Sequence, residues 1–220
     1  MDYPIIHEFD QNSEEWHLVR CGKMTSSRFA TVLAKSKDGG ATGTRRKYMD
    51  DICSERGTGL PSSSYCNSAM DWGTEHEDEA IAEYEKEKSK DQPQKVIVRR
   101  VGFVEMSDWL GGSPDGLVGE DVVIEVKCPN SATQYRYSRM IRKNPTWYDP
   151  KYKWQMQGNM WITGRKYCDW ISYDPRFKMP KNRLLIVRVP RDEKAIAELQ
   201  IKCEAFKQEA LAEIRQSNPF

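Results

Sequence analysis

One apolar stretch of the sequence holds charged side chains at strand spacing. Residues 111–129 read GGSPDGLVGEDVVIEVKCP, which places Asp115 on a Pro-Gly turn and Glu125 and Lys127 two residues apart in a β-branched run. Side chains two apart in a strand lie on the same face. Burying such a pair without a partner is costly. The pattern therefore predicts that this face meets either water or a charged group from outside the chain.

A divalent metal ion with a phosphodiester would be such a group. Asp115 and Glu125 on neighbouring strands supply the hard oxygen ligands that Mg²⁺ or Mn²⁺ prefers, and the backbone carbonyl of Val126 would add another. Lys127 would orient a water, lower its pKa or stabilise charge that develops on phosphorus. The spacing thus favours phosphodiester hydrolysis, although Glu and Lys also alternate on ordinary exposed strands.

Two further residues are candidates for the same site. Residues 70–88 have a helical pattern in which Glu77 shares a stripe with apolar side chains, so its carboxylate would face inward and pair with a cation or with a buried polar group. Gln155 lies in a second helical segment, residues 150–163, and either it or Gln157 would hold a water or a carboxylate. Plain packing explains each glutamine equally well.

The remaining pattern predicts the elements that must position these residues. Helical patterns cover residues 14–20, 27–34 behind a Thr25/Ser26 cap, 45–56, 70–88, 131–143, 150–163 and 192–216, and strand patterns cover 96–106, a short piece before Asp115, 121–127, 166–173 and 184–189. The length suits one domain over residues 1–220, and this order predicts the α/β (α+β) class, in which helices flank a central mixed β-sheet.

Composition narrows the function classes. The chain has 34 Lys and Arg against 33 Asp and Glu, which argues against a surface coated in positive charge. Carboxylates gather between residues 71 and 85 and basic residues form separate islands, an arrangement that suits a metal-dependent enzyme acting on a polyanion but also suits ordinary solvated faces.

The six cysteines form no C-x-x-C pair, so neither a zinc nor an iron–sulfur site is indicated. We expect a cytoplasmic protein without a membrane segment or a signal peptide.

Several segments resemble, in order and spacing, a known family. They are EEWHLVRCGKMTSSRF, MDWGTEHEDEA, GGSPDGL, IEVKCP, YKWQMQGNMW and SYDPRF. They are similar to the phage lambda exonuclease family of alkaline exonucleases, which includes YqaJ-like viral recombinases, in the PD-(D/E)xK nuclease superfamily. The resemblance implies a restriction-endonuclease-like core and a phage-encoded or prophage-encoded enzyme in a bacterial host. It also implies a Mg²⁺-dependent exonuclease, with Mn²⁺ as a substitute and two ions per site. This enzyme digests one strand of linear duplex DNA from the 5′ end and leaves 3′ overhangs for recombination.

The resemblance also implies residue roles and partners. Asp115 and Glu125 match metal ligands and Lys127 the catalytic lysine, while Glu77 and Gln155 match supporting positions. DNA contacts are implied for Arg20, Ser27 and Ser113 at the 5′-phosphate, Met70 as an apolar wedge in the terminal base pair, and Lys37 and Arg45 along the duplex. Thr133 stands where the family has a basic residue, so Arg136 or Arg139 would serve instead. The family's members are similar in forming ring-shaped homotrimers and in working with a single-strand annealing protein.

Two other functions use the same residues. A PD-(D/E)xK endonuclease, of the restriction or junction-resolving kind, would cut covalently closed DNA. A non-catalytic DNA-binding recombination adaptor on a decayed nuclease fold would show no Mg²⁺-dependent hydrolysis, and the joint presence of Asp115, Glu125 and Lys127 counts against it.

Overall fold

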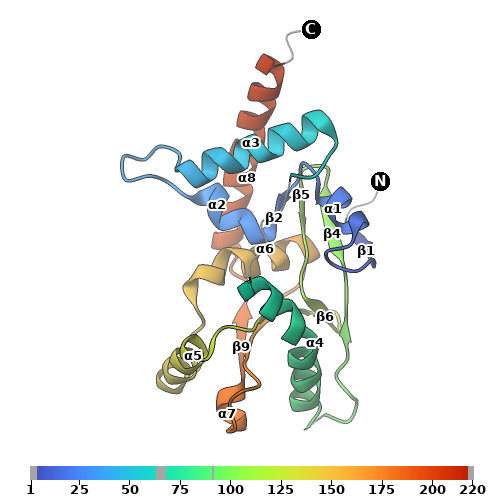
Figure 1. The fold of residues 1–220 in the computed structure, drawn as a ribbon, viewed down its shortest axis with the longest axis vertical. Coiled ribbons are helices and arrows are strands. Elements are labelled where there is room, and N and C mark those ends of the chain that lie inside the picture. The colour runs from blue at the N-terminus through green and yellow to red at the C-terminus, as the bar shows by residue number, and fades with distance from the viewer. Residues whose placement is uncertain (1–3, 63–67, 91, 218–220) are drawn as a thin grey trace.

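The chain folds as a mixed α/β protein with two sheets flanked by helices (Figure 1). The computed structural model describes residues 4–62, 68–90 and 92–217, without the side chains of residues 68–71 and 217. The α-helices are α1 (Glu14–Arg20), α2 (Phe29–Leu33), α3 (Gly43–Thr58), α4 (Ser68–Ser89), α5 (Ser131–Lys143), α6 (Lys153–Thr163), α7 (Pro180–Arg183) and α8 (Glu193–Ser217), and the 3₁₀ turns are η1 (Ser26–Arg28) and η2 (Pro150–Tyr152). The strands are β1 (Ile5–His7), β2 (Met24–Thr25), β3 (Val98–Arg99), β4 (Phe103–Ser107), β5 (Leu110–Gly112), β6 (Gly116–Val118), β7 (Val122–Lys127), β8 (Tyr167–Tyr173) and β9 (Leu184–Pro190).

The larger sheet carries the charged strand identified from the sequence. Its order is β3-β6-β7-β8-β9, with β7 parallel to β8 and the other pairs antiparallel. Residues 122–126 of β7 are all buried and mostly β-branched, which is the composition of a strand covered on both faces. The register pairs Glu125 with Trp170 of β8, so the acidic residue lies in the middle of the sheet.

A second sheet was not predicted from the sequence. Its order is β1-β4-β5-β2, and the single strand expected over residues 96–106 is divided between the two sheets, as β3 and β4. The division falls at Gly102, where an added Cβ would lie 2.1 Å from the carbonyl oxygen of Phe9. Only glycine permits this close approach of two backbones, so the chain turns here from one sheet to the other.

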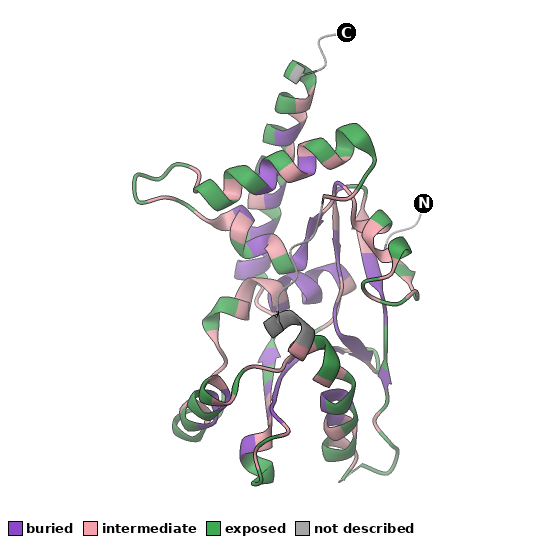
Figure 2. Ribbon diagram, in the orientation of Figure 1, coloured by how far each residue is buried: buried purple, intermediate pink, exposed green. Residues whose placement is uncertain are grey.

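Helix α6 joins the sheets and the helical layer. Met156 and Met160 are fully buried on it, and the helix contacts strands of both sheets. At Gly158 the ring of Phe29 approaches so closely that an added Cβ would lie 2.5 Å from it, so η1 and α2 pack directly on the α6 backbone. Helices α2, α3 and α8 form a separate layer whose inner side is buried (Figure 2).

Most predicted helices are observed within a few residues of their expected bounds. Helices α1 and α5 begin and end where the sequence pattern places them. The segment expected as one helix from residue 27 begins instead with the 3₁₀ turn η1, and the Thr25 side chain does not cap it. Within the described residues, none of the helices could span a bilayer.

Candidate active site

The sheet brings Asp115, Glu125 and Lys127 together, as their spacing predicts. Asp115 directly precedes β6, which pairs antiparallel with β7 so that Gly116 lies opposite Ile124. The Oδ2 atom of Asp115 accepts a hydrogen bond of 2.6 Å from the backbone N–H of Val126. On the same strand, Lys127 Nζ lies 2.5 Å from Glu125 Oε1. Glu125 is fully buried and Asp115 nearly so.

Helix α4 adds Glu77 to this group. The apolar stripe predicted from the sequence is observed, because Ala80, Ile81 and Tyr84 are buried on one face of the helix. Arg100, from the turn between the two sheets, donates a hydrogen bond of 2.6 Å to Glu77 Oε1. Sequence reasoning missed Arg100, because it appeared there as one more residue of a continuous strand.

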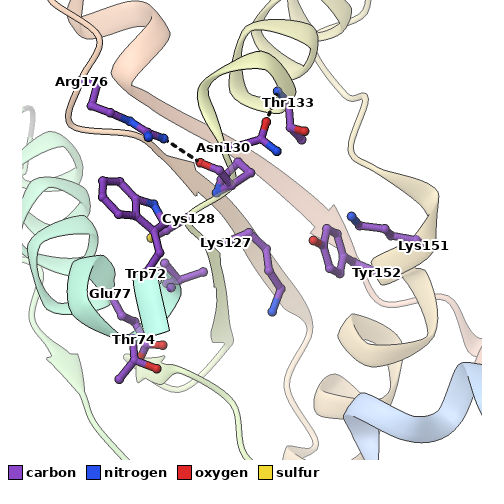
Figure 3. Close-up of a pocket in the computed structure, with 13 residues that line it drawn as sticks. Trp72, Thr74, Glu77, Lys127, Cys128, Asn130, Thr133, Lys151, Tyr152 and Arg176 are labelled. Carbon is purple, nitrogen blue, oxygen red and sulfur yellow. Dashed lines mark hydrogen bonds between the residues drawn. The ribbon is translucent and has the colours of Figure 1, made fainter. Parts of the chain in front are cut away.

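Lys127 and Glu77 line a cavity of about 660 Å³ (Figure 3). The close-up shows the Lys127 amine between Tyr152 on one side and Glu77 with Thr74 on the other. The lining residues come from α4, from β7 and the turn after it, from α5, from η2 and from the loop after β8. They are Trp72, Gly73, Thr74, Glu77, Val126, Lys127, Cys128, Pro129, Asn130, Thr133, Lys151, Tyr152 and Arg176.

Burial dominates the electrostatics of the group. It raises the pKa of Glu125 to about 8 against the opposing effect of Lys127, and it raises the pKa of Glu77 to about 7, with a further contribution from the charge of Asp115. The pKa of Asp115 is raised by burial as well. Burial alone would lower the pKa of Lys127, but the carboxylates of Glu125 and Asp115 outweigh it and raise this pKa. Lys127 is therefore a cation at neutral pH.

The donor set fits a divalent cation that keeps much of its water. Within the described residues, no group of three or more His, Cys, Asp or Glu is placed to hold a metal ion. Mg²⁺ does not need one, because it typically binds through one or two carboxylates, waters and substrate phosphate oxygens. The Oε1 atom of buried Glu125 accepts no hydrogen bond of regular geometry, although Lys127 Nζ lies close to it. The N–H of Val126 faces Asp115, so its carbonyl, on the same side of the strand, also faces this position.

Asn159 of α6 is a residue of the site that sequence reasoning missed. Its Nδ2 atom donates a hydrogen bond of 3.0 Å to Glu125 Oε2, and its side chain is fully buried. Its Oδ1 atom has no hydrogen-bond partner within the described residues. The signal was present in the sequence, since Asn159 lies four residues after Gln155 and therefore on the same face of the helix.

The two glutamines of α6 behave differently. Gln157 is buried away from the carboxylates, where it donates to the Pro190 carbonyl at 3.0 Å and accepts from the N–H of Asp192 at 2.8 Å. It therefore ties α6 to the start of α8. Gln155 is half-buried and forms no side-chain hydrogen bond within the described residues, so its supporting role stays a prediction.

Arg20 and Ser113 meet, as the resemblance implies for a phosphate contact. Arg20 Nη1 donates to Ser113 Oγ at 3.1 Å, and its guanidinium lies 3.8 Å from the centre of the Trp16 ring. Ser27 is exposed nearby on η1, where its Oγ lies 3.3 Å from Thr25 Oγ1. Burial lowers the pKa of Arg20 to about 10, against the opposing effects of Tyr48 and Glu55.

A second guanidinium, that of Arg28, lies close to this group. It stacks 4.6 Å from the Tyr48 ring centre, and its buried Nε has no hydrogen-bond partner within the described residues. Tyr48 also interacts electrostatically with Arg20, so the two guanidinium groups flank one phenol. Neither arginine forms a salt bridge with a described carboxylate. The Glu55 carboxylate opposes the effect of burial on the pKa of Arg20 but forms no salt bridge with it. Two partly buried cations without a salt bridge within the described residues indicate a binding position for an anion.

The other residues implied as DNA contacts lie on α3, on the loop before it, on α4 and on α5. Lys37 is exposed in the loop before α3. Arg45 lies on α3, where it forms a two-pronged salt bridge with Glu209 of α8 at 2.8 and 2.9 Å, so its guanidinium already has a partner. The side chain of Met70 lies outside the described residues. Thr133 lines the cavity, and Arg136 and Arg139 are exposed further along α5, where Arg136 is 3.5 Å from Asp149.

Comparisons with known proteins point to one group of nucleases. Residues 15–166 match the family model described as the YqaJ-like viral recombinase domain. The crystal structure of the alkaline exonuclease LHK-Exo from Laribacter hongkongensis is similar over 94% of this chain and 97% of that chain, with 36% sequence identity and a TM-score of 0.80. The same enzyme in complex with dAMP gives 37% identity, the same coverage and a TM-score of 0.80.

A more distant likeness concerns the fold alone. The crystal structure of a phage-related exonuclease from Haemophilus somnus is similar over 89% of this chain and 96% of that chain. The TM-score is 0.60 and the sequence identity is 16%. No curated protein matches the chain.

Proposed function

The chain belongs to the family of YqaJ-like viral recombinase domains, and on this premise we propose that it is a metal-dependent exonuclease. It would digest one strand of linear double-stranded DNA from the 5′ end and leave 3′ single-stranded overhangs for recombination. The alkaline exonuclease from Laribacter hongkongensis supports the reaction class, since it shares 36% of its residues with this chain over nearly its full length.

The observation that carries the proposal is the grouping of Asp115, Glu125, Lys127 and Glu77, of which Lys127 and Glu77 line the cavity. Three carboxyl groups and one ammonium cation in a buried position would be unfavourable in a structural core. The same set is useful where a cation and a phosphodiester complete the charge balance. The large cavity beside Lys127 has room for a nucleotide.

Asp115, Glu125 and the Val126 carbonyl would hold Mg²⁺, or Mn²⁺ in its place, and the carboxylate of Glu77 is available for a second ion. When bound, the metal lowers the pKa of a water molecule and offsets the negative charge of the phosphodiester. Lys127, protonated at neutral pH, donates hydrogen bonds and stabilises the charge that develops on phosphorus. Asn159 fixes the orientation of the Glu125 carboxylate.

The anion position at Arg20 and Arg28 supports the choice of the 5′ end. A terminal phosphate monoester carries close to two negative charges at neutral pH. Two guanidinium groups that form no salt bridge within the described part of the chain would balance that charge, and the Ser113 hydroxyl adds a contact. An internal phosphodiester, with a single negative charge, would match the pair less well.

Assembly and partners follow as part of the same proposal. A ring-shaped homotrimer around DNA would keep the enzyme on its substrate without a strong static affinity. A single-strand annealing protein would receive the overhang. Sedimentation of the purified protein at micromolar concentration tests the ring, and a monomer under these conditions would remove it from the proposal.

The decisive assay uses linear duplex DNA labelled separately at each 5′ and 3′ end, incubated with and without Mg²⁺. Early release of the 5′ label as a mononucleotide, only in the presence of the metal, supports the proposal. Release from the 3′ label first would reverse the polarity. A covalently closed plasmid is the control, because its cleavage would instead identify an endonuclease, and absence of any hydrolysis would leave a DNA-binding adaptor.

A further inference from the structure

One lobe of the molecule has an unbalanced charge. Residues 131–148 and 175–183, here called the basic lobe, contain eight Lys and Arg but no Asp or Glu. The whole chain is close to neutral at net +1, so the rest of the chain is net acidic. Two of the eight cations are compensated from outside the lobe, since Arg176 pairs with Asp174 and Arg136 lies 3.5 Å from Asp149.

Five of the other six cations of the basic lobe are available to a ligand, whereas the Arg183 guanidinium donates to the Phe177 and Lys178 carbonyls. Within the described residues none of the six forms a salt bridge, and all except Arg183 are exposed. The six are Arg139, Arg142, Lys143, Lys178, Lys181 and Arg183. Surface cations without acidic neighbours repel one another, so this arrangement lowers stability unless a polyanion binds there.

A buried polar network makes the basic lobe rigid. Gln134 of α5 donates to the backbone carbonyls of Asn182 and Arg183 at 2.9 and 3.0 Å, and Ser138 donates to Asn182 Oδ1 at 2.7 Å. Helix α5 is thereby fixed on α7 (Figure 1), and Arg139, Arg142 and Lys143 of α5 are exposed. A ligand would therefore meet a preorganised surface and would cause little loss of conformational entropy in the protein.

The basic lobe borders the candidate active site. Asn130, which caps α5, and Thr133 in its first turn line the cavity, as does Arg176 from the loop before α7 (Figure 3). The cations of the lobe thus begin where the cavity of Lys127 ends. A strand of nucleic acid that leaves the cavity on this side reaches them without crossing the acidic part of α4.

An exposed aromatic ring in the basic lobe indicates which kind of polyanion it would bind. Tyr135 is 52% exposed on α5. Arg139 and Arg142 follow it at i+4 and i+7, so the ring and two guanidinium groups form one stripe. Aromatic rings among cations are the usual surface for single-stranded nucleic acid, because only unpaired bases offer a face for stacking.

We propose that the basic lobe binds single-stranded DNA that continues from the active-site cavity. The inference rests on the proposed function for the identity of the nucleic acid as DNA. It adds a second binding surface outside the catalytic group, and it assigns to Tyr135 a stacking contact with a base.

The first test measures the salt dependence of binding. Fluorescence anisotropy of a labelled oligo(dT) is followed in EDTA, so that hydrolysis plays no part, for the wild type and for a Lys178→Gln, Lys181→Gln, Arg142→Gln, Lys143→Gln variant. We expect the slope of log affinity against log salt to become shallower by about 0.7 for each contact removed. A Lys47→Gln, Lys194→Gln variant removes exposed cations from α3 and α8 and should keep the wild-type slope. Equal slopes for all three proteins would overturn the proposal.

The second test separates base stacking from charge. Tyr135→Ala should weaken binding of oligo(dT) on the order of tenfold, the usual effect of losing one stacked base. Tyr135→Phe should retain the affinity, and an abasic oligomer of the same length should bind the wild type and Tyr135→Ala alike. If Tyr135→Ala binds oligo(dT) as the wild type does, the single-strand assignment is wrong. Because both tests are made without metal, a chain that lacks nuclease activity would still give a clear answer.

Discussion

Asn159 donates a hydrogen bond of 3.0 Å to the Oε2 atom of Glu125, and neither side chain is exposed to solvent. The bond leaves Oε1, the oxygen next to Lys127, as the part of the carboxylate without a regular hydrogen bond. A helix side chain thus determines which oxygen of a strand carboxylate is presented to the site.

Asn159→Ala should reduce activity without unfolding the protein. Loss of an outer hydrogen bond to a metal-binding carboxylate typically costs about 10- to 100-fold in metal affinity or activity. We expect a higher Mg²⁺ concentration at half-maximal rate, measured at saturating DNA, with an unchanged circular dichroism spectrum. Gln157→Ala is the control on the same helix, because it should lower thermal stability by removing the bonds to Pro190 and Asp192 while leaving the Mg²⁺ requirement unchanged.

Asp115→Asn and Glu125→Gln should each abolish hydrolysis and keep the fold. Under the proposed function, each removes a negative oxygen ligand from a position that would concentrate a divalent cation. Lys127→Ala should also abolish turnover but should leave metal binding in place, which isothermal titration with Mn²⁺ would show. Near-wild-type rates in any of the three variants would place the site elsewhere.

The metal-free protein should lose stability as the pH rises from about 5 to about 8. The pKa values of Glu125 and Glu77 are raised in the folded state to about 8 and about 7, so the folded state binds protons more tightly than the unfolded state does. The stabilisation is complete below the unfolded pKa of about 4.5 and is lost as the pH passes through the folded values, on the order of a few kcal/mol in total.

Urea denaturation in EDTA at several pH values measures this loss. The Glu125→Gln variant cannot ionise at this position and should show a flatter dependence. Mg²⁺ should restore stability most at alkaline pH, where the carboxylates no longer need to release protons to bind it. A wild-type curve that matches that of Glu125→Gln would show that these carboxyl groups do not control the dependence.

Arg20→Ala should remove a preference for 5′-phosphorylated ends. The wild type is expected to degrade a 5′-phosphorylated duplex faster than a 5′-hydroxyl duplex, and the variant should lose about 1.5–3 kcal/mol of that difference, the contribution of a hydrogen bond to a charged group. Arg28→Ala should act in the same direction. Arg46→Ala, an exposed arginine of α3, is the control and should keep the preference. Equal slowing of both substrates by Arg20→Ala would indicate a general or structural contact.

The sequence predicted those parts of the site that depend on a regular repeat. The two-residue period of a strand placed Glu125 and Lys127 on one face, and the helical stripe turned Glu77 inward. Asn159 was missed because one polar residue in an apolar helix has several equivalent explanations until its neighbours in space are known. Arg100 was missed because its role depends on a break in the strand next to Gly102, whose backbone passes close to the distant residue Phe9.

The fold class was predicted and is confirmed, but its division into two sheets was not. Strands β1, β2 and β6 have two or three residues each, too few for an alternating pattern to be recognised, whereas β5 is the short piece predicted before Asp115. Their pairing depends on contacts between residues far apart in the chain, such as the parallel pairing of Met24 with Leu110. Helices α1 and α5 were predicted correctly. Each begins directly after a capping side chain, Ser13 or Asn130, so its start depends on local sequence.

The crossing of the chain from β5 to β6 has a consequence for the length of each catalytic step. Ser113, which contacts Arg20, and Asp115, beside the backbone of Val126, are separated by a single residue and lie at the ends of strands in different sheets. Their α-carbons can be no more than about 7 Å apart. Under the proposed function, the same short piece of backbone would touch the terminal phosphate and the reacting phosphate. The backbone between Ser113 and Asp115 would then fix the distance between the two phosphates. The number of nucleotides removed in one turnover would depend on this distance rather than on the affinity of the enzyme for DNA.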